Sequence, residues 1–466
     1  MNLKSIADAV GGKLHIVGNN ADIENKKVKQ VVIDSRLVEN DFVFIATKGE
    51  RVDGHSFIDA VFEKGALGVI CEKEPQNPKG SYIVVKDSFA ALKDLATYYR
   101  SILDIKVVGV TGSVGKTSTK EFIASVLEKQ YNTLKTNGNY NNEIGLPLTV
   151  LRIKRDCEVA VLEMGISDFG EMHRLSKIAK PDVCVITNIG QCHLENLGTR
   201  DGILKAKTEI FDYMAADGSV VLNGDDDKLI TVNQKAPLFF GMNPDMYDKY
   251  AVYATDYINK GLIGSEVVIH INTHNRKENF KVNIPLPGEH MVYNALTATA
   301  VGVLFEMSAD NIKAGLESVE PVGGRSHVIY TSKYTLIDDC YNANPVSMKA
   351  AIDLLGMTKT QKNTRNVAIL GDMFELGENE SELHREVGVY VANNHIDCVI
   401  CIGELCKNMY DGITSVDNYS GKSYYYADKE SMIKDIDNIL ADGDTILIKA
   451  SNGMRFGEIR EILENK

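Results

Sequence analysis

A glycine-containing turn that ends in Gly-Lys-Thr is the strongest chemical signal in this sequence. The apolar run 107–110 leads into the turn 111–117, and a helical pattern follows over 116–129. In such a unit the backbone N–H groups face an anion, the lysine reaches the outer phosphates and the threonine hydroxyl ligates Mg²⁺. The turn is a variant, because Val110 stands where the general pattern has glycine. It predicts a nucleoside triphosphate site formed by Gly112, Ser113, Val114, Gly115, Lys116, Thr117 and Ser118.

Further polar residues follow the next strand-like runs. Glu163 lies at the end of the run 159–164, and His193 lies just past another apolar run. Parallel strands bring ligands to their carboxyl ends, where a carboxylate is a natural Mg²⁺ ligand. We therefore expect Glu163 and His193 near the triphosphate, against the alternatives of a solvated acid and a structural histidine. The amide-rich segment 136–143 is by itself typical of a turn, and Lys205 and Lys207 are typical of a solvated helix face.

A triphosphate site alone does not decide the activity, because a kinase, a GTPase and a ligase all have one. The composition limits the partners that the protein could bind. Its 51 basic and 64 acidic side chains in 466 residues give a net charge of −13. Wide surfaces for nucleic acid or an anionic membrane are excluded, since nothing would neutralise their phosphates. No stretch reaches the ~18 consecutive apolar residues of a membrane-spanning helix. The first residues have the spacing of an amphipathic helix rather than of a signal peptide, so we expect a cytoplasmic protein without membrane insertion.

The eight cysteines do not form the pattern of a disulfide framework. Cys398 and Cys401 have a CxxC spacing, which can indicate metal or redox chemistry. No second cysteine pair lies nearby, however, and the surrounding run is apolar. An extended chain also points the two thiols to opposite faces, so we expect both in a core strand.

The elements that must position these residues fall into about three domains, at ~150 residues per domain. Residues 1–86 contain short β-like runs, and residues 87–321 repeat strand, glycine turn and helix, with an antiparallel excursion near 250–285. Residues 322–466 open on the hinge-like pair Gly323 and Gly324 and repeat the strand–helix rhythm. The predicted fold is α/β with three domains: a small N-terminal α/β domain, a central P-loop domain with a mostly parallel sheet, and a C-terminal Rossmann-like domain.

Taken together, the motifs resemble the Mur ligase family over essentially the whole chain. The first third contributes 34–36, 42–49 and 53–57, and the middle contributes 111–117, 138–145 and 188–195. The segment 287–295 is similar to the family's segment near the adenine. In the last third, 338–347 and 370–377 are similar to the dipeptide-adding member, and the Asp-Asn-Pro-Arg signature of the diaminopimelate-adding relative is absent.

This resemblance implies an ATP-dependent amide ligase that joins D-alanyl-D-alanine to UDP-N-acetylmuramoyl-tripeptide through an acyl phosphate. The N-terminal domain would bind the UDP end of the substrate. The alternatives within the architecture are a diaminopimelate- or lysine-adding Mur-type enzyme and a folylpolyglutamate synthase-like ligase. The alternative from a different class of protein is a P-loop switch or kinase. The implied partners are small-molecule substrates, with no nucleic acid, and the implied state is a monomer.

The resemblance also implies roles for single residues. Thr117, Glu163 and His193 would hold two Mg²⁺ ions near ATP, and Lys207 aligns with the lysine that the family carbamylates. Lys116, Lys207, His193 and Glu163 would be the catalytic residues. Asn294, Arg325 and Asp339 would complete the ATP site. The implied substrate-binding residues are Ser35, Arg36, Lys48, Asp53, His55, Asn139, Asn141, Asn142, Tyr341, Asn342, Asn344 and Asp372.

Two positions depart from the family pattern. Cys340 replaces the usual serine, a near-isosteric change that we expect to be silent. The segment 449–454 lacks the usual glycine and arginine, so the resemblance assigns no fixed role to Lys449 or Ser451.

Overall fold

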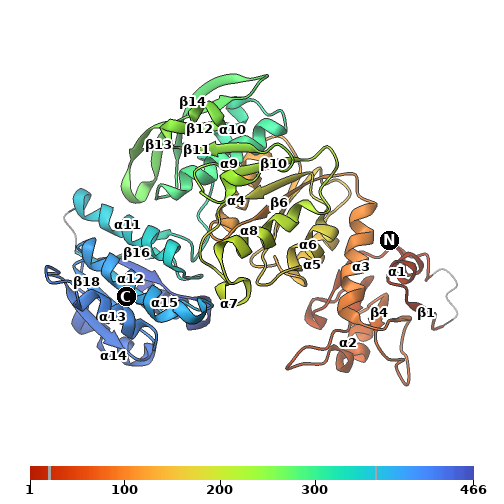
Figure 1. Ribbon diagram of the computed structural model, residues 1–466. Helices are drawn as coiled ribbons and strands as arrows, with labels where there is room; N and C mark the ends of the chain where they lie inside the picture. The colour runs from red at the N-terminus through yellow and green to blue at the C-terminus, as the bar shows by residue number, and fades with distance from the viewer. Residues whose placement is uncertain (19–22, 363–364) are drawn as a thin grey trace.

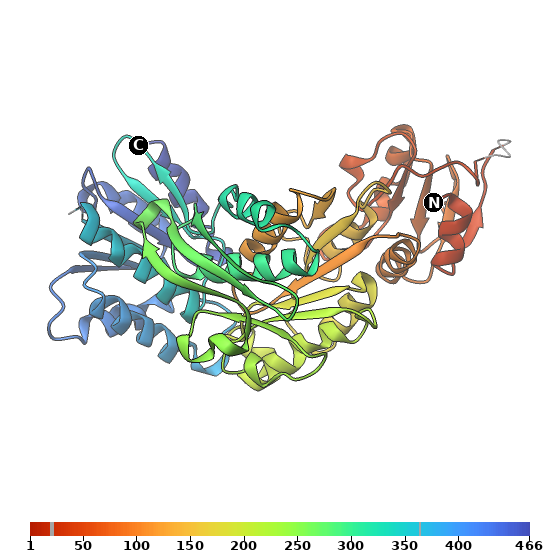
Figure 2. The ribbon, with the colours of Figure 1, turned by 90° about the horizontal axis from the view of Figure 1, so that it is seen from above.

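Each third of the chain forms a β-sheet of its own in the computed structural model, which describes residues 1–18, 23–362 and 365–466. Within these residues the sheets have five, nine and six strands. The three parts lie in a row, with the nine-stranded part in the middle (Figure 1), and the view from above shows the same order (Figure 2). The predicted α/β fold with three sheet-containing parts is confirmed. The domain boundaries at 86/87 and 321/322 stay predictions.

The N-terminal sheet has the order β1-β5-β4-β3-β2. Strand β1 runs antiparallel to β5, and the other neighbours are parallel. The elements of this part are α1 (Leu3–Ala9), β1 (Lys13–His15), β2 (Gln30–Val32), β3 (Phe42–Ile45), α2 (Ile58–Glu63), β4 (Gly68–Cys71) and β5 (Tyr82–Val84).

A helix that the sequence analysis did not predict, α3 (Ser88–Ser101), follows this sheet. Asp87 caps its first turn by accepting from the backbone N–H groups of Phe89 and Ala90. Leu92 and Leu95 of α3 are fully buried in an apolar cluster that extends from the N-terminal sheet to one face of the central sheet. The first two parts of the chain therefore share a core.

The central sheet has the order β14-β13-β12-β11-β10-β9-β6-β8-β7. Strands β6 to β12 are parallel, whereas β13 and β14 pair antiparallel, as the alternating pattern predicts. The strands are β6 (Lys106–Thr111), β7 (Thr133–Lys135), β8 (Val159–Glu163), β9 (Val183–Ile186), β10 (Ser219–Asn223), β11 (Leu238–Gly241), β12 (Tyr250–Asn259), β13 (Ser265–Asn272) and β14 (Lys277–Ile284).

Helices cover both faces of the central sheet, as its near-continuous apolar strands require. One face packs against α4 (Lys116–Leu127), α9 (His290–Leu304) and α10 (Ala309–Glu317). The other packs against α5 (Gly145–Leu151), α6 (Glu171–Ala179) and α8 (Arg200–Thr208). The short helix α7 (Leu194–Leu197) lies between β9 and α8 in the chain.

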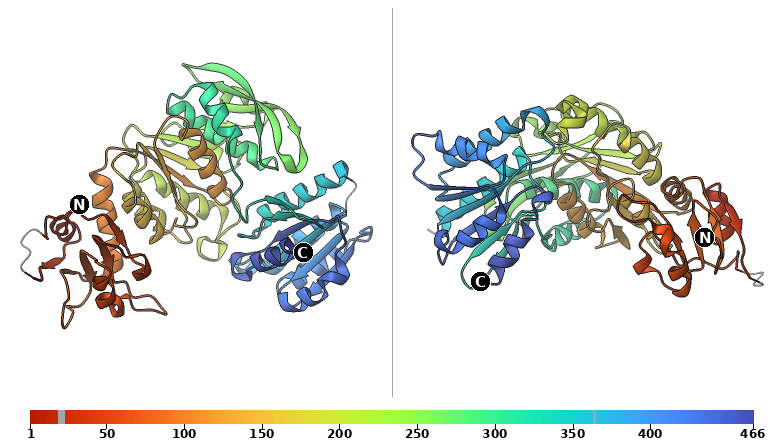
Figure 3. Two further views of the ribbon diagram at one scale, coloured as in Figure 1. Left: turned by 180° about the vertical axis from the view of Figure 1, so that it is seen from behind. Right: turned by 90° about the horizontal axis from the view of Figure 1, so that it is seen from below.

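The C-terminal sheet has the order β15-β16-β20-β17-β18-β19, and β15 is its antiparallel strand. Its helix α11 lies between this sheet and the central part (Figures 1 and 3). The elements are β15 (His327–Tyr330), β16 (Thr335–Asp338), α11 (Pro345–Lys362), β17 (Asn366–Gly371), α12 (Glu380–Asn393), β18 (Cys398–Ile402), α13 (Cys406–Thr414), β19 (Lys422–Tyr426), α14 (Lys429–Ile439), β20 (Thr445–Lys449) and α15 (Gly457–Glu464).

The cysteine prediction is confirmed. Cys398 and Cys401 are buried in β18 and belong to apolar clusters on opposite faces of the C-terminal sheet. All eight cysteines are free thiols. Over the described parts of the chain, no helix combines the length and apolar character needed to cross a membrane.

Candidate active site

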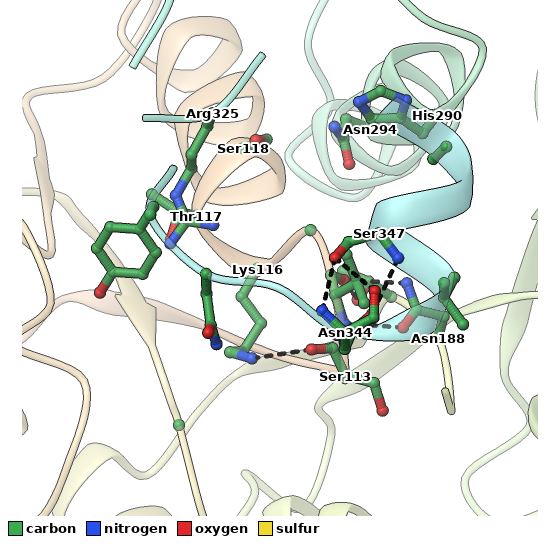
Figure 4. Close-up of a pocket in the computed structure, with 18 of the residues that line it drawn as sticks. Ser113, Lys116, Thr117, Ser118, Asn188, His290, Asn294, Arg325, Asn344 and Ser347 are labelled. Atoms are coloured by element: carbon green, nitrogen blue, oxygen red, sulfur yellow. Dashed lines mark hydrogen bonds between the residues drawn. The ribbon is translucent and has the colours of Figure 1, made fainter. Parts of the chain in front are cut away.

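A cleft of about 600 Å³ lies where the central part meets the C-terminal part. One wall is formed by the glycine turn after β6 and by the carboxyl ends of β8 and β9, and the other by the segment 324–326 and the start of α11 (Figure 4). Of the predicted ATP-binding residues, those that line it are Ser113, Val114, Gly115, Lys116, Thr117, Ser118, Asn294, Arg325 and Asp339. The cleft thus lies at the carboxyl ends of parallel strands, where open α/β sheets bind their ligands.

The glycine turn is held in shape by the strand beside it. Gly112 and Gly115 have φ angles of 149° and 85°, which glycine adopts without steric cost. A Cβ at Gly112 would lie 1.9 Å from the Thr187 hydroxyl oxygen. That hydroxyl donates to the Val114 carbonyl (2.6 Å), and the Asn188 side chain accepts from the Val114 N–H (2.9 Å). These contacts fix the backbone N–H groups of the turn in place.

Lys116 and Thr117 begin α4 and lie beside this turn (Figure 4). The Lys116 ammonium donates to the Gly112 carbonyl (2.8 Å), and burial lowers the pKa of Lys116. The Thr117 side chain is buried and lines the cleft. A positive charge and a hydroxyl in these places suit the outer phosphates and a divalent cation.

Glu163 supplies a buried carboxylate at the end of β8. Its Oε1 accepts a hydrogen bond from Asn141 Nδ2 (2.8 Å). Its Oε2 is buried and has no hydrogen-bond partner among the described residues. Leaving such an oxygen unpaired is costly, and carboxylate and hydroxyl oxygens are the donors that Mg²⁺ prefers. Glu163 and Thr117 therefore fit a divalent cation.

Lys120 is a buried cation behind Glu163 that the sequence analysis did not single out. Its ammonium donates to the Thr136 carbonyl (2.7 Å) and lies 3.0 Å from Glu121 Oε1 and 3.9 Å from Glu163 Oε2. It balances the charge of both carboxylates. Its position four residues after Lys116, and so on the same face of the helix, is a signal that could have found it.

His193 lies in the cleft wall just before α7, in a left-handed backbone conformation (φ 52°). Its Nδ1 lies 2.7 Å from Glu375 Oε2 of the C-terminal part. The hydrogen bond from His193 lowers the pKa of Glu375. The sequence analysis missed Glu375, because no local pattern pairs residues so far apart in the chain.

Lys207 is fully buried in α8 and does not line the cleft. Its ammonium has no hydrogen-bond partner in the part of the chain that the structure describes. Burial, together with the neighbouring charge of Lys116, lowers the pKa of Lys207 to about 8. Lys205, two residues earlier, is exposed and lies over the Phe169 ring. The solvated helix face predicted from the residues alone holds for Lys205 and is wrong for Lys207. Their spacing of two residues puts them on opposite sides of a helix.

The far end of the cleft is formed by α9. His290 and Asn294 lie side by side there (Figure 4). The Thr119 hydroxyl donates to Asn294 Oδ1 (2.7 Å), and burial lowers the pKa of His290. Asn294 is therefore oriented by the helix that carries the glycine turn.

The C-terminal wall is organised around Asp339. Its carboxylate accepts from the Ser326 N–H (3.0 Å) and from the Lys449 ammonium (2.5 Å). Lys449 is buried and also donates to the Asn342 carbonyl (3.0 Å). Arg325 stacks over the Tyr341 ring at 4.0 Å. Lys449 thus holds Asp339, which in turn holds the Ser326 backbone, a role that the divergent segment 449–454 did not predict.

The predicted substrate-binding residues fall into separate groups. Those that line this cleft are Asn141, Asn142, Tyr341, Asn342 and Asn344. Asn139 is exposed and lies outside it, and buried Asp372 accepts from the Cys406 N–H (2.7 Å) behind it. The roles of Asn139 and Asp372 stay predictions.

The remaining predicted residues lie in the N-terminal part. Lys48, Asp53 and His55 line a second pocket of about 510 Å³. His55 Nδ1 lies 2.7 Å from Asp53 Oδ1, which fixes the ring. Neither Ser35 nor Arg36 is among the residues that line that pocket. Arg36 is exposed and pairs with Asp34.

Family models match nearly all of this architecture. The model described as Mur ligase family, catalytic domain, matches residues 27–100, the Mur ligase middle domain matches 110–302, and the Mur ligase glutamate ligase domain matches 324–452. A curated relative from Bacillus subtilis is 37% identical over 99% of this chain and 98% of its own length. The chain belongs to the Mur ligase family. That relative, like one from Escherichia coli at 32% identity over 100% of this chain and 99% of its own, is named UDP-N-acetylmuramoyl-tripeptide–D-alanyl-D-alanine ligase.

Solved structures agree with this Mur ligase over its full length. A crystal structure of MurF from Acinetobacter baumannii has a TM-score of 0.88 and 30% identity, and covers 100% of this chain and 99% of its own. The MurF ligase of Thermotoga maritima, solved in complex with ADP, has a TM-score of 0.80 and 30% identity, and covers 94% of this chain and 97% of its own.

The charge network behind Glu163 gives a test of this Mur ligase's stability. Lys120→Met should lower the free energy of unfolding by about 3–5 kcal/mol, because it leaves the buried Glu163 carboxylate without its neighbouring cation. Lys135→Met is the matched control: Lys135 also pairs with Glu121 but is more exposed, so its loss should cost about 1 kcal/mol or less. Urea unfolding measures both. Equal losses would contradict a buried, charge-balancing Lys120.

Proposed function

We propose that this Mur ligase joins D-alanyl-D-alanine to UDP-N-acetylmuramoyl-tripeptide, converting ATP to ADP and phosphate and giving the pentapeptide precursor of peptidoglycan. The observation that carries the proposal is the composition of the cleft. The glycine turn, Glu163 and His193 face the segments 338–347 and 324–326 of the C-terminal part across it. The names of the relatives from Bacillus subtilis and Escherichia coli support the same substrates.

The proposed chemistry has two steps. A carboxylate oxygen of the tripeptide attacks the γ-phosphorus of ATP, and the bond to the β-phosphate oxygen breaks, giving an acyl phosphate and ADP. The free amine of D-alanyl-D-alanine then attacks the acyl carbon, loses a proton and expels phosphate. Lys116 and the N–H groups of the glycine turn stabilise charge on the phosphates. Arg325, which lies across the cleft, adds positive charge from the second wall.

We propose that Thr117, Glu163 and His193 hold the two Mg²⁺ ions of the reaction. The bound cations would neutralise charge where two anions meet. Asn141 and Lys120 keep the Glu163 carboxylate oriented toward the cleft. Asn294 would hold the adenine end, and Asp339 the nucleotide from the C-terminal side.

The acyl phosphate must be kept from water, and the cleft's position between two parts of the chain suits this need. Gly323 and Gly324 form the hinge in the proposal. The second pocket, with Lys48, Asp53 and His55, would hold the UDP end together with Ser35 and Arg36. We further propose a monomeric, cytoplasmic enzyme with domains at 1–86, 87–321 and 322–466.

Phosphate release tests the proposed reaction. With ATP, Mg²⁺ and UDP-N-acetylmuramoyl-tripeptide, adding D-alanyl-D-alanine should raise the rate of phosphate release many-fold, and Lys116→Ala should abolish it because the phosphates lose their lysine. Diaminopimelate, lysine and glutamate serve as competing amines with their own acceptors. Release that is indifferent to every amine would overturn the proposal, and release driven by another amine would reassign the substrate.

We propose that Lys207 is carbamylated. A neutral lysine amine adds CO₂ and loses a proton, so the cation becomes an anion, and a pKa lowered to about 8 makes the neutral form accessible near neutral pH. A buried ammonium without a partner would become a carboxylate-like ligand.

¹³C NMR with labelled bicarbonate tests this modification. The carbamate signal should be stronger at pH 8.5 than at pH 6.5, because the neutral amine fraction rises as the pH passes the pKa. Lys207→Ala should lose the signal and most activity, with partial recovery on adding short carboxylic acids. Lys205→Ala is the control and should keep both. No signal in the wild type and no recovery would count against the modification.

A further inference from the structure

An ion pair between His193 and Glu375 joins the C-terminal part to the proposed metal site. His193, at the end of the loop after β9, places Nδ1 2.7 Å from Glu375 Oε2. Glu375 lies in the loop between β17 and α12. Nearby, the backbone of Glu195 lies beside Gly377, where a Cβ would be in van der Waals contact with it at 3.5 Å. The two loops therefore contact each other through both backbone and side-chain atoms.

Both partners of this pair have unusual backbone conformations. His193 has a φ of 52° and Glu375 a φ of 62°. Residues other than glycine seldom adopt positive φ, and such positions concentrate at functional sites because the surrounding structure must stabilise them. Two of them facing each other across the boundary between two parts of the chain indicate a contact that the fold maintains on both sides.

The geometry also separates the two ring nitrogens of His193. Glu375 occupies Nδ1, whereas Nε2 forms no hydrogen bond to the described residues, and His193 lines the cleft with Thr117 and Glu163. Histidines that bind metals almost always donate the other ring N–H to a carboxylate or carbonyl, which fixes the tautomer and the ring orientation. The ion pair between Glu375 and Nδ1 therefore suits a His193 that binds a metal ion through Nε2.

The loop that carries Glu375 is rigidly attached to the C-terminal part. The Met373 N–H donates to His384 Nε2 (2.9 Å), and the Phe374 N–H donates to the Ser451 hydroxyl (2.9 Å). Asp372 accepts from the Cys406 N–H (2.7 Å). Glu375 therefore reaches His193 only when the whole C-terminal part is in the position seen here. That part has apolar clusters separate from the core shared by the other two.

We propose that Glu375 is a positioning residue, which orients His193 for the divalent cation when the C-terminal part closes on the central one. The inference rests on the proposed function, because it takes His193 as a cation ligand. Metal binding and closure then favour each other, since a coupling between two equilibria acts equally in both directions.

Titration with Mn²⁺ in the presence of ADP, followed by electron paramagnetic resonance, tests the proposal on the full-length protein. Glu375→Ala should weaken Mn²⁺ binding by about tenfold, the lower end of the effect of removing such a partner. Glu375→Gln should keep affinity within about threefold of the wild type, because its amide oxygen accepts the same hydrogen bond. Glu378→Ala, an exposed acid in the same loop, is the matched control and should leave affinity unchanged.

A double mutant separates positioning from a general loss of negative charge. In the His193→Ala background, Glu375→Ala should cause no further loss of Mn²⁺ affinity. Wild-type affinity in Glu375→Ala, or the same loss with and without His193, would overturn the inference. Neither outcome depends on the peptide substrates. If the proposed ligase reaction is wrong, the wild type will show no amine-dependent phosphate release. The Mn²⁺ titration does not measure phosphate release, so the two failures can be told apart.

Discussion

Repulsion between anions is the constraint on which this structure depends. An ATP-driven amide ligase must bring a carboxylate against a triphosphate, and the site must supply fixed positive charge and N–H dipoles before the two can meet. The turn after β6 provides the dipoles, and the contacts of Thr187 and Asn188 with Val114 keep them oriented. Because this preorganisation is built into the fold, it needs no rearrangement when charge develops.

The two walls of the cleft differ in how firmly they are attached. The wall with the glycine turn belongs to a central sheet whose core continues into the N-terminal part. The wall with Arg325 and Asp339 belongs to a part with its own apolar clusters, and contacts such as Lys449 with Asp339 organise it internally. A rigid half that holds the phosphates and a separately packed half that covers them suit a reaction with a hydrolysable intermediate.

Local patterns predict much of this arrangement. The strand–turn–helix pattern places Lys116 and Thr117, and the rule for parallel strand ends brings Glu163 and His193 into the same cleft. Helix α3 was missed although its cap Asp87 and its leucine spacing are visible in the sequence. Lys120 was missed although its spacing of four residues from Lys116 is visible in the sequence. Glu375 and Lys449 could not be predicted, because each acts through a partner set by tertiary packing.

Transfer of ¹⁸O tests the central claim, activation of an acid by phosphoryl transfer, most directly. The tripeptide substrate is labelled with ¹⁸O in its terminal carboxylate, and the phosphate released in the presence of D-alanyl-D-alanine is analysed by mass spectrometry. An acyl phosphate predicts one ¹⁸O atom in each phosphate, because the attacking carboxylate oxygen leaves with the phosphorus. Phosphate without label would mean that water, and not the carboxylate, attacks ATP, and would contradict the account.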